Sequence, residues 1–320
     1  MKVEDRTAKA RGVFVGEVVG NRAICREHYR LGLQVEGFPA TRPGQFVQVQ
    51  CRPLGQPVGA RETDWPAGGA PILTQPELLD KEAFLRRPLG LAGRADGGGG
   101  AELSFIYRVV GTGTRWLAGL AEGDELSVLG PLGNGFAIRE AAPRAVLVGG
   151  GAGMPPLVYL AAALAAAGKQ TVALVGARTA EVLPLTLVPG AEVRVDGWAT
   201  PCIAEFAATG APTGVATDDG SLGYRGFVSE AFVKWLGESR ARPGEVVVYC
   251  CGPEALMQAV GAACVAAGVE CQLAMERHMA CGMGTCQSCI VKTKADTPEG
   301  WKYSLCCADG PVFDARDVLW

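Results

Sequence analysis

The sequence predicts a multidomain protein of the β plus α/β class, with an N-terminal antiparallel β-barrel, a doubly wound parallel sheet and a small cysteine-rich C-terminal domain. Three observations lead to this prediction. Short β-type runs punctuated by Pro and Gly fill residues 11–51, strand-like and helix-like runs alternate after about residue 140, and five of the 12 cysteines follow residue 280. We expect three domains, at 1–139, 140–270 and 271–320.

The composition indicates a chain with a large core and without a nucleic-acid partner. Of the 320 residues, 48% are hydrophobic, and the formal net charge is -3. The first twelve residues are charged and lack the apolar run of a signal peptide, so we expect a cytoplasmic protein. Residues 145–168 are uncharged, but Gly149-Gly-Gly and Pro155-Pro156 interrupt them. This pattern predicts a strand, a turn and a helix, and no contact with a membrane.

The barrel is expected from strand signals at 13–15, 31–35, 46–50, 103–110 and 125–129, which turn residues separate. The glycine run 97–100 is interpreted as a hairpin, because no helix start follows it. Residues 52–82 are rich in Pro and Gly and lack sustained periodicity, so we expect a long excursion from the barrel.

The second domain is expected to contain strands at 144–148, 171–175, 192–195 and 245–249 and helices at 157–167 and 254–267. Such alternation predicts a parallel sheet with helices on both faces. Ligands bind these sheets at the carboxyl ends of the strands, where the glycine turn 149–153 and the turn 250–253 fall. A glycine turn before a helix suits a phosphate, although it can also be purely structural.

The C-terminal cysteines have the spacing of a plant-type 2Fe-2S site. Cys281, Cys286 and Cys289 form a C-x4-C-x2-C run, and Cys306 and Cys307 compete as the fourth ligand. The glycines at 282 and 284 give the loop the backbone freedom that wrapping a cluster requires.

Two other kinds of metal site are alternatives to a plant-type 2Fe-2S site. Four cysteines also suit zinc, but zinc sites usually pair two short knuckles, whereas this pattern has one triple and one distant ligand. A Rieske centre needs two histidine ligands, and neither His28 nor His278 belongs to a matching Cys-His pair. A zinc-stabilised nucleotide-binding sensor module therefore stays as the non-enzymatic alternative.

Four motifs together resemble those of the ferredoxin-NADP reductase superfamily. They are Arg87-Pro88, the G-x-G-T turn at 111–114, the glycine turn at 149–153 and the Cys-Gly-Pro turn at 251–253. Within it, the stretch from Glu276 through Cys289, followed by Cys307-Ala-Asp-Gly-Pro, closely resembles the electron-transfer subunits of type B dihydroorotate dehydrogenase. The resemblance covers nearly the whole chain except residues 52–82.

The resemblance implies FAD on the barrel, with Arg87 paired to the pyrophosphate as a fork donor. Gly90 stands where the family signature Arg-Pro-x-Ser has serine, so a hydroxyl is missing there. Tyr107 either lines the flavin or belongs to the core. The residues assigned to FAD are Arg87, Pro88, Leu89, Gly90, Tyr107, Gly111, Gly113 and Thr114.

The resemblance also implies a nicotinamide site and settles the choice of the fourth cluster ligand. Cys251 would lie near the position of hydride transfer, and Cys250 would be a buried strand thiol. Arg178 could meet a 2′-phosphate and favour NADP, whereas the resemblance favours NAD. The family pattern Cys-x-Asp-Gly-Pro selects Cys307 over Cys306. The residues assigned to the nucleotide are Gly150, Gly151, Gly153, Gly252 and Pro253.

These three cofactors imply an electron relay, because nicotinamide moves electron pairs, a 2Fe-2S cluster moves single electrons, and a flavin does both. The resemblance implies an NAD-dependent oxidoreductase component of pyrimidine biosynthesis. A separate catalytic subunit would oxidise dihydroorotate at FMN, with two of each chain in a heterotetramer. The alternative is the small subunit of a ferredoxin-dependent NAD(P)H oxidoreductase or a sulfide dehydrogenase, which commonly have Asp where Cys281 stands.

Overall fold

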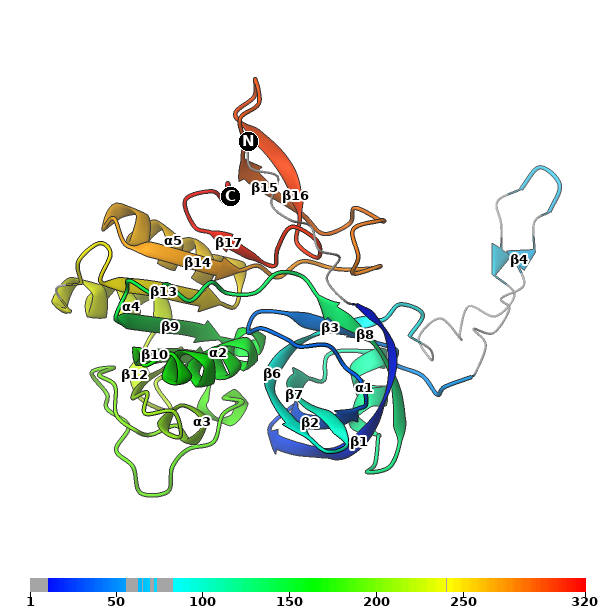
Figure 1. Cartoon of the computed structure of the whole chain (residues 1–320), viewed down its shortest axis with the longest axis horizontal. Coiled ribbons are helices and arrows are strands. Elements are labelled where there is room, and N and C mark those ends of the chain that lie inside the picture. Colours follow the sequence, from blue (N-terminus) through cyan, green and yellow to red (C-terminus); the bar gives the residue numbers. More distant parts are fainter. Residues whose placement is uncertain (1–10, 56–62, 65, 70–71, 74–82, 240) are drawn as a thin grey trace.

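The computed structural model describes residues 11–55, 63–64, 66–69, 72–73, 83–239 and 241–320. A closed barrel lies beside a seven-stranded sheet, and a C-terminal hairpin rises from the junction of the two (Figure 1). The predicted fold class is therefore confirmed.

The barrel closes in the order β1-β2-β7-β6-β3-β8. Alternate residues of its strands point inward, as Leu31, Leu33 and Val35 do, and form the barrel core. The strands are β1 (Gly12–Cys25), β2 (His28–Val35), β3 (Phe46–Val49), β6 (Arg87–Gly97), β7 (Gly100–Arg108) and β8 (Glu125–Leu132).

Helix α1 (Thr112–Ala118) follows β7 and is held by the side chain of Asn21. The Asn21 amide donates to the carbonyl oxygens of Leu117 and Leu120, at 2.8 and 3.0 Å. Its Oδ1 accepts from the Tyr107 hydroxyl at 3.1 Å. One polar side chain thus joins β1, β7 and the end of α1.

The predicted glycine hairpin is confirmed, since Gly97 pairs with Gly100 where β6 turns into β7. The excursion contains a short ladder of β4 (Thr63–Asp64) and β5 (Ile72–Leu73), which Figure 1 draws away from the barrel. The rest of the segment 56–82 lies mostly outside the described residues.

The sheet has the order β12-β11-β10-β9-β13-β14-β17 and is parallel except for β17. Helices α4 and α5 cover one face and α2 and α3 the other, so the predicted doubly wound arrangement is confirmed. The strands are β9 (Arg144–Gly150), β10 (Gln170–Ala177), β11 (Thr213–Thr217), β12 (Tyr224–Arg225), β13 (Val246–Cys251), β14 (Glu270–Ala274) and β17 (Val312–Asp314). The helices are α2 (Met154–Ala166), α3 (Ala204–Ala207), α4 (Val228–Glu238) and α5 (Glu254–Ala266).

The strand predicted at 192–195 is wrong. This stretch is an irregular connection in which Val195 is 81% exposed and Arg194 pairs with Asp196. The place beside β10 belongs to β11, whose five residues are all buried. Charged residues and valines alternate at 192–195, which is the pattern of a half-buried strand. Strand β11 is short and contains Gly214, so its strand signal is weaker.

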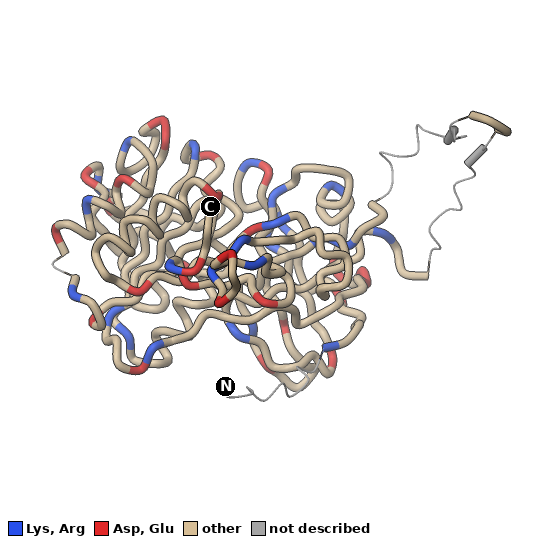
Figure 2. Tube along the Cα trace, turned by 90° about the horizontal axis from the view of Figure 1, so that it is seen from above, with Lys and Arg blue, Asp and Glu red and all other residues tan. Residues whose placement is uncertain are grey.

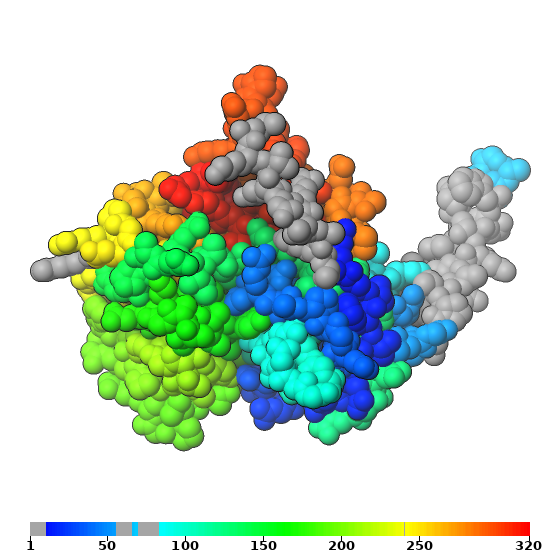
Figure 3. Space-filling model, viewed as in Figure 1, coloured from blue at the N-terminus to red at the C-terminus, as the bar shows by residue number. Residues whose placement is uncertain are grey.

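The C-terminal segment forms the hairpin β15 (Ile290–Lys294) and β16 (Trp301–Leu305), and then returns to the sheet as β17. In Figure 3 this last segment (red) is packed between the hairpin (orange) and the green residues below it. One buried cluster joins the three parts, with Phe46 from the barrel, Val146 from the sheet and Cys289 from the C-terminal segment. The boundary expected after residue 270 falls inside β14, which pairs with β13 in the sheet, and the domain division stays a prediction.

Charged residues are spread over the molecule, and the uncharged stretch 145–168 is divided between three elements. Lys and Arg are interspersed with Asp and Glu over both halves of the molecule (Figure 2). Within the described part of the chain, no helix is long and apolar enough to cross a bilayer. The uncharged stretch 145–168 is β9, a tight turn and α2, as predicted.

Asn21→Ala should destabilise the barrel by about 1–3 kcal/mol, because it removes three hydrogen bonds and leaves the Tyr107 hydroxyl buried without its acceptor. Tyr107→Phe removes only one of these bonds and should cost less. Urea unfolding of the two variants beside the wild type measures both effects. Equal stability of Asn21→Ala and wild type would show that Asn21 does not hold α1.

Candidate functional site

The two turns predicted to bind the nicotinamide nucleotide are packed directly against each other. They end the neighbouring strands β9 and β13, where Gly149 pairs with Cys251. A Cβ atom on Gly153 would lie 2.3 Å from the Cys251 carbonyl carbon, and one on Gly150 would lie 2.9 Å from Leu256 Cδ2. Gly252 has φ +155°, in the region that favours glycine. The glycines are therefore required for the two backbones to approach.

The turn after β9 is open toward solvent at Gly151, where φ is +54° and an added Cβ would meet nothing within 4 Å. Pro155 and Pro156 occupy the first turn of α2 and carry no N–H. Backbone donors for a phosphate at this turn must therefore come from residues 151–153. The first turn of α2 contains no acidic side chain, so no negative charge opposes an anion there.

Cys251 is 4% exposed at the end of β13. Burial, with a smaller effect from the carboxyl group of Glu276, raises the pKa of the Cys251 thiol well above its ordinary value. The thiol is therefore neutral at physiological pH and is suited to packing against a ligand rather than to nucleophilic attack. Cys250 is fully buried on the other face of the sheet, as predicted.

The motif Arg87-Pro88-Leu89-Gly90 forms the start of β6 and pairs with β3. Leu89 points into the barrel core, so Pro88 and Gly90 lie on the outer face of the strand. A Cβ on Gly90 would be 3.7 Å from Pro156 Cδ at the start of α2. The outer face of β6 therefore meets the nicotinamide turn, and a serine at position 90 would fit without a clash.

Arg87 lies against the first turn of α1. A Cβ on Gly113 would lie 3.1 Å from Arg87 Nε and 3.3 Å from Cys51 Sγ, which is tighter than ordinary contact, so glycine lets Arg87 lie close to this turn. Arg87 Nη1 donates to the Leu85 carbonyl oxygen at 2.7 Å. A guanidinium held against a backbone turn has the donor chemistry that a pyrophosphate requires.

Thr114 and Tyr107 make contacts within the protein. Thr114 Oγ1 accepts from the N–H groups of Val110 and Gly111, at 2.9 and 3.1 Å, and so fixes the turn. Tyr107 lies in the barrel core, stacked on Tyr29 with ring centroids 5.8 Å apart. Contact of either residue with a flavin remains a prediction.

The cysteine loop 281–289 has the backbone that a cluster site requires. Gly282, Gly284 and Gln287 have positive φ, at 70°, 94° and 55°. The N–H groups of Met283 and Cys286 donate to Cys281 Sγ, and that of Cys307 donates to Cys289 Sγ, each at 3.4 Å. N–H groups directed at sulfur stabilise a negatively charged iron-sulfur cluster.

The four ligand candidates come from two segments, the loop 281–289 and the turn after β16. The Cys286 N–H group donates to Cys281 Sγ, and the Cys307 N–H group donates to Cys289 Sγ. Among the described residues, no three His, Cys, Asp or Glu side chains are arranged around a single ion. A 2Fe-2S cluster takes its four thiolates on two irons.

Cys306 has a different environment from Cys307. Its thiol donates to the Met275 carbonyl oxygen at 3.1 Å, and burial raises its pKa to about 12. Burial and the Cys289 thiol raise the pKa of Cys307 to about 12, but ligation to a metal removes such a proton. The Ser288 hydroxyl group lowers the pKa of Cys286 to about 6, which favours its thiolate.

Comparison with known proteins shows the family of this chain. Residues 276–319 match the model of the iron-sulfur cluster binding domain of dihydroorotate dehydrogenase B. The electron transfer subunit of dihydroorotate dehydrogenase B (NAD(+)) from Bacillus velezensis is 37% identical over 313 residues, covering 94% of this chain and 96% of that protein. The one from Caldanaerobacter subterraneus subsp. tengcongensis is 31% identical over 303 residues, covering 95% and 97%.

The chain belongs to the family of dihydroorotate dehydrogenase B electron transfer subunits. The resemblance stated from the sequence motifs is thus confirmed. Among solved structures, a chain of the NADH-dependent reduced ferredoxin-NADP oxidoreductase is similar, with a TM-score of 0.69, 26% identity, and coverage of 95% of this chain and 90% of that one.

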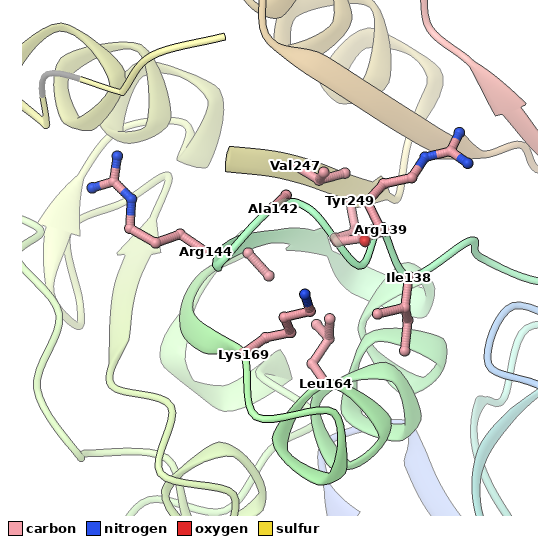
Figure 4. A pocket seen from close by; sticks show the side chains of 9 residues that line it. Ile138, Arg139, Ala142, Arg144, Leu164, Lys169, Val247 and Tyr249 are labelled. Carbon is pink, nitrogen blue, oxygen red and sulfur yellow. The ribbon is translucent and has the colours of Figure 1, made fainter. Parts of the chain in front are cut away.

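A shallow depression lies away from both glycine turns of this family member. It is near the amino ends of β9 and β13, and the Lys169 side chain points toward its centre (Figure 4). Ligands of parallel sheets bind at the carboxyl ends, so this depression is not the nucleotide site. It is lined by Ile138, Arg139, Ala142, Arg144, Ala145, Leu164, Lys169, Val247 and Tyr249.

Two residues at the centre of the site were not selected from the sequence. Gln48 lies on β3 beside Pro88, and Arg86 Nη1 donates to its carbonyl oxygen at 3.1 Å and to that of Ser127 at 3.0 Å. The sequence signal for Gln48 is its position between Val47 and Val49. A polar side chain in a buried strand is unusual and indicates a specific hydrogen-bond partner.

Cys307→Ser should abolish the cluster, whereas Cys306→Ser should keep it, because serine at 306 can still donate to the Met275 carbonyl oxygen. Iron and sulfide analysis, with the visible spectrum, measures the cluster, and FAD content shows that the barrel is intact. Full iron in Cys307→Ser, or its loss in Cys306→Ser, would contradict the choice of ligand.

Gly90→Ser should tighten FAD binding about tenfold, since the hydroxyl group adds a hydrogen-bond donor in a place with room for it. Gly90→Ala is the control, because it adds the Cβ without the donor. Equilibrium titration of the apoprotein with FAD measures the affinity. Weaker binding by Gly90→Ser than by Gly90→Ala would show that the hydroxyl group does not face the flavin.

Proposed function

We propose that this chain passes electrons between the FMN of a catalytic dihydroorotate dehydrogenase subunit and NAD, through its own 2Fe-2S cluster and FAD. One observation carries the proposal. The outer face of β3 and β6 touches the turn after β9 at Gly90 and the cysteine loop at Gln48, so the three proposed cofactor sites would meet at one surface.

The residues present suit the three groups. Arg87, with the turn at Gly113, would hold the FAD pyrophosphate, and Pro88 and Gly90 would face its ring system. When bound, FAD supplies exchange between electron pairs and single electrons, which nicotinamide and an iron-sulfur cluster each need. Cys281, Cys286, Cys289 and Cys307 would hold the cluster through their four thiolates.

The nicotinamide site excludes charge from its inner wall. Cys251 would present a neutral thiol there, and Gly150, Gly153 and Gly252 let the two turns pack against each other. Because the wall is packed and buried, water is kept away from the position of hydride transfer.

The acidic turn at the end of β11 favours NAD over NADP. Asp218 and Asp219 donate backbone N–H groups to the carbonyl oxygens of Ala177 and Arg178, so the turn lies beside the end of β10. Carboxylates at this edge accept hydrogen bonds from a ribose 2′-hydroxyl and repel a 2′-phosphate. Arg178 follows β10 beside this turn, and its charge is partly balanced by Asp218.

The cysteine loop is where we place contact with the catalytic subunit. Cys286 is exposed and Met283 is 41% exposed, so part of the cluster site reaches the surface. Electron transfer requires the cluster to come close to the partner's cofactor. The cysteine loop is the part of the proposed relay that we place at the surface facing the partner. We propose a heterotetramer with two copies of each subunit.

The ferredoxin-linked alternative is supported by the solved structure of NADH-dependent reduced ferredoxin-NADP oxidoreductase, whose chain has a similar fold. Its sequence identity of 26% is lower than the 37% of the dihydroorotate dehydrogenase B subunit from Bacillus velezensis. We therefore rank the dihydroorotate system first.

Co-expression with the catalytic subunit of the same source tests the proposal. We expect a complex that contains FMN, FAD, iron and sulfide and reduces NAD with dihydroorotate, while the catalytic subunit alone does not. NADP should be a much poorer acceptor. A chain that fails to bind the catalytic subunit but transfers electrons between NADH and ferredoxin would replace this function with the alternative.

A further inference from the structure

Gln48 is a buried amide without a hydrogen-bond partner. Its side chain is 0% exposed, and neither Nε2 nor Oε1 has a partner among the described groups. The other described side chains with a buried unpaired atom, such as His28 and Thr213, have one such atom each. Leaving a buried amide unpaired costs about 1–3 kcal/mol, so a ligand that pairs with it is expected.

The amide lies directly under the cysteine loop. A Cβ on Gly282 would be 2.7 Å from Gln48 Cγ and 2.8 Å from its Nε2. Gly282 also has φ +70°, so both sterics and backbone favour glycine there. The loop residue after the first cluster ligand is thus shaped to bring the loop backbone onto Gln48. In Figure 1 the orange loop after β14 lies just above β3 and β8.

The neighbouring protein groups do not satisfy this amide. Pro88, which pairs with Gln48 across the ladder, carries no N–H. Arg86 already donates to the carbonyl oxygens of Gln48 and Ser127 and to Ser127 Oγ. Of the two cofactor sites beside Gln48, the cysteine loop approaches Nε2 directly, whereas the flavin would lie against the neighbouring Pro88.

We propose that the Gln48 side chain donates its Nε2–H to a sulfur atom of the cluster or of its thiolates, and so acts as a positioning residue of the cluster. This inference rests on the proposed 2Fe-2S site. Sulfur in such a cluster carries negative charge and already receives N–H groups from residues 283, 286 and 307. An amide that is buried, unpaired and adjacent supplies one more donor, from the flavin-binding barrel.

A donor to cluster sulfur stabilises the reduced, more negative state and raises the reduction potential. Gln48→Met keeps the length of the side chain and removes the amide. Gln48→Glu keeps its shape and replaces the donor with a negative charge. Both should lower the cluster potential, and a tenfold shift of the reduction equilibrium corresponds to about 59 mV for one electron.

The test is a redox titration of the cluster followed by electron paramagnetic resonance, on the full protein with FAD and cluster present. We expect the reduction equilibrium to shift against the reduced cluster about tenfold in Gln48→Met and further in Gln48→Glu, with altered g values. Gln50→Met is the matched control, since Gln50 directly follows β3 and its Oε1 accepts from Arg86. Its potential should equal that of the wild type.

Two outcomes would overturn the inference. Gln48→Met and Gln48→Glu with full iron content and wild-type potential and g values would show that the amide pairs only with water or other protein groups. Equal shifts in Gln50→Met and Gln48→Met would show a general effect of the strand. A wild-type protein without iron and sulfide would instead end the proposed function itself.

Discussion

The packing of two loops onto the outer face of β3 and β6 is the constraint on which the candidate site depends. Gly282 brings the cysteine loop down onto Gln48, and Gly90 leaves room for Pro156 at the start of α2. A larger residue at Gly282 would push the loop outward, because its Cβ would overlap the glutamine side chain. Electron transfer needs short separations between cofactors, and these contacts are what keep the three sites together.

A continuous hydrophobic core keeps these contacts in place. Phe46 and Leu132 of the barrel, Val248 of the sheet and Val291 of the C-terminal hairpin belong to one buried cluster. The three parts therefore cannot move independently without exposing apolar surface, at roughly 25 cal/mol per Å². The strand β17 strengthens this by returning the C-terminal segment to β14 at the edge of the sheet.

Much of this site could be predicted from the sequence because its signals are local. The spacing of Cys281, Cys286 and Cys289 lies within nine residues, and glycine turns at strand ends mark nucleotide sites wherever they occur. The choice of Cys307 over Cys306 came from a family pattern, and the thiol of Cys306 is seen to be occupied by the Met275 carbonyl oxygen.

The remaining features depend on tertiary contacts that a local pattern does not contain. Strand β6 holds Pro88 and several glycines, which are unfavourable in strands, yet the closed barrel enforces it. Residues 192–195 have strand periodicity but lie at the surface, since the sheet position is taken by β11. The contact between Gln48 and Gly282 joins residues far apart in the sequence, so the local pattern around Gln48 does not show that the cysteine loop covers it.

We propose that the nicotinamide, flavin and cluster sites of this chain form one connected path for electrons. Rapid mixing of the isolated, cofactor-loaded chain with NADH under anaerobic conditions tests it most directly, with flavin absorbance and the signal of the reduced cluster followed together. We expect both to change, the cluster following the flavin without any partner subunit. Bleaching of the flavin while the cluster stays oxidised, although its potential permits reduction, would contradict the account.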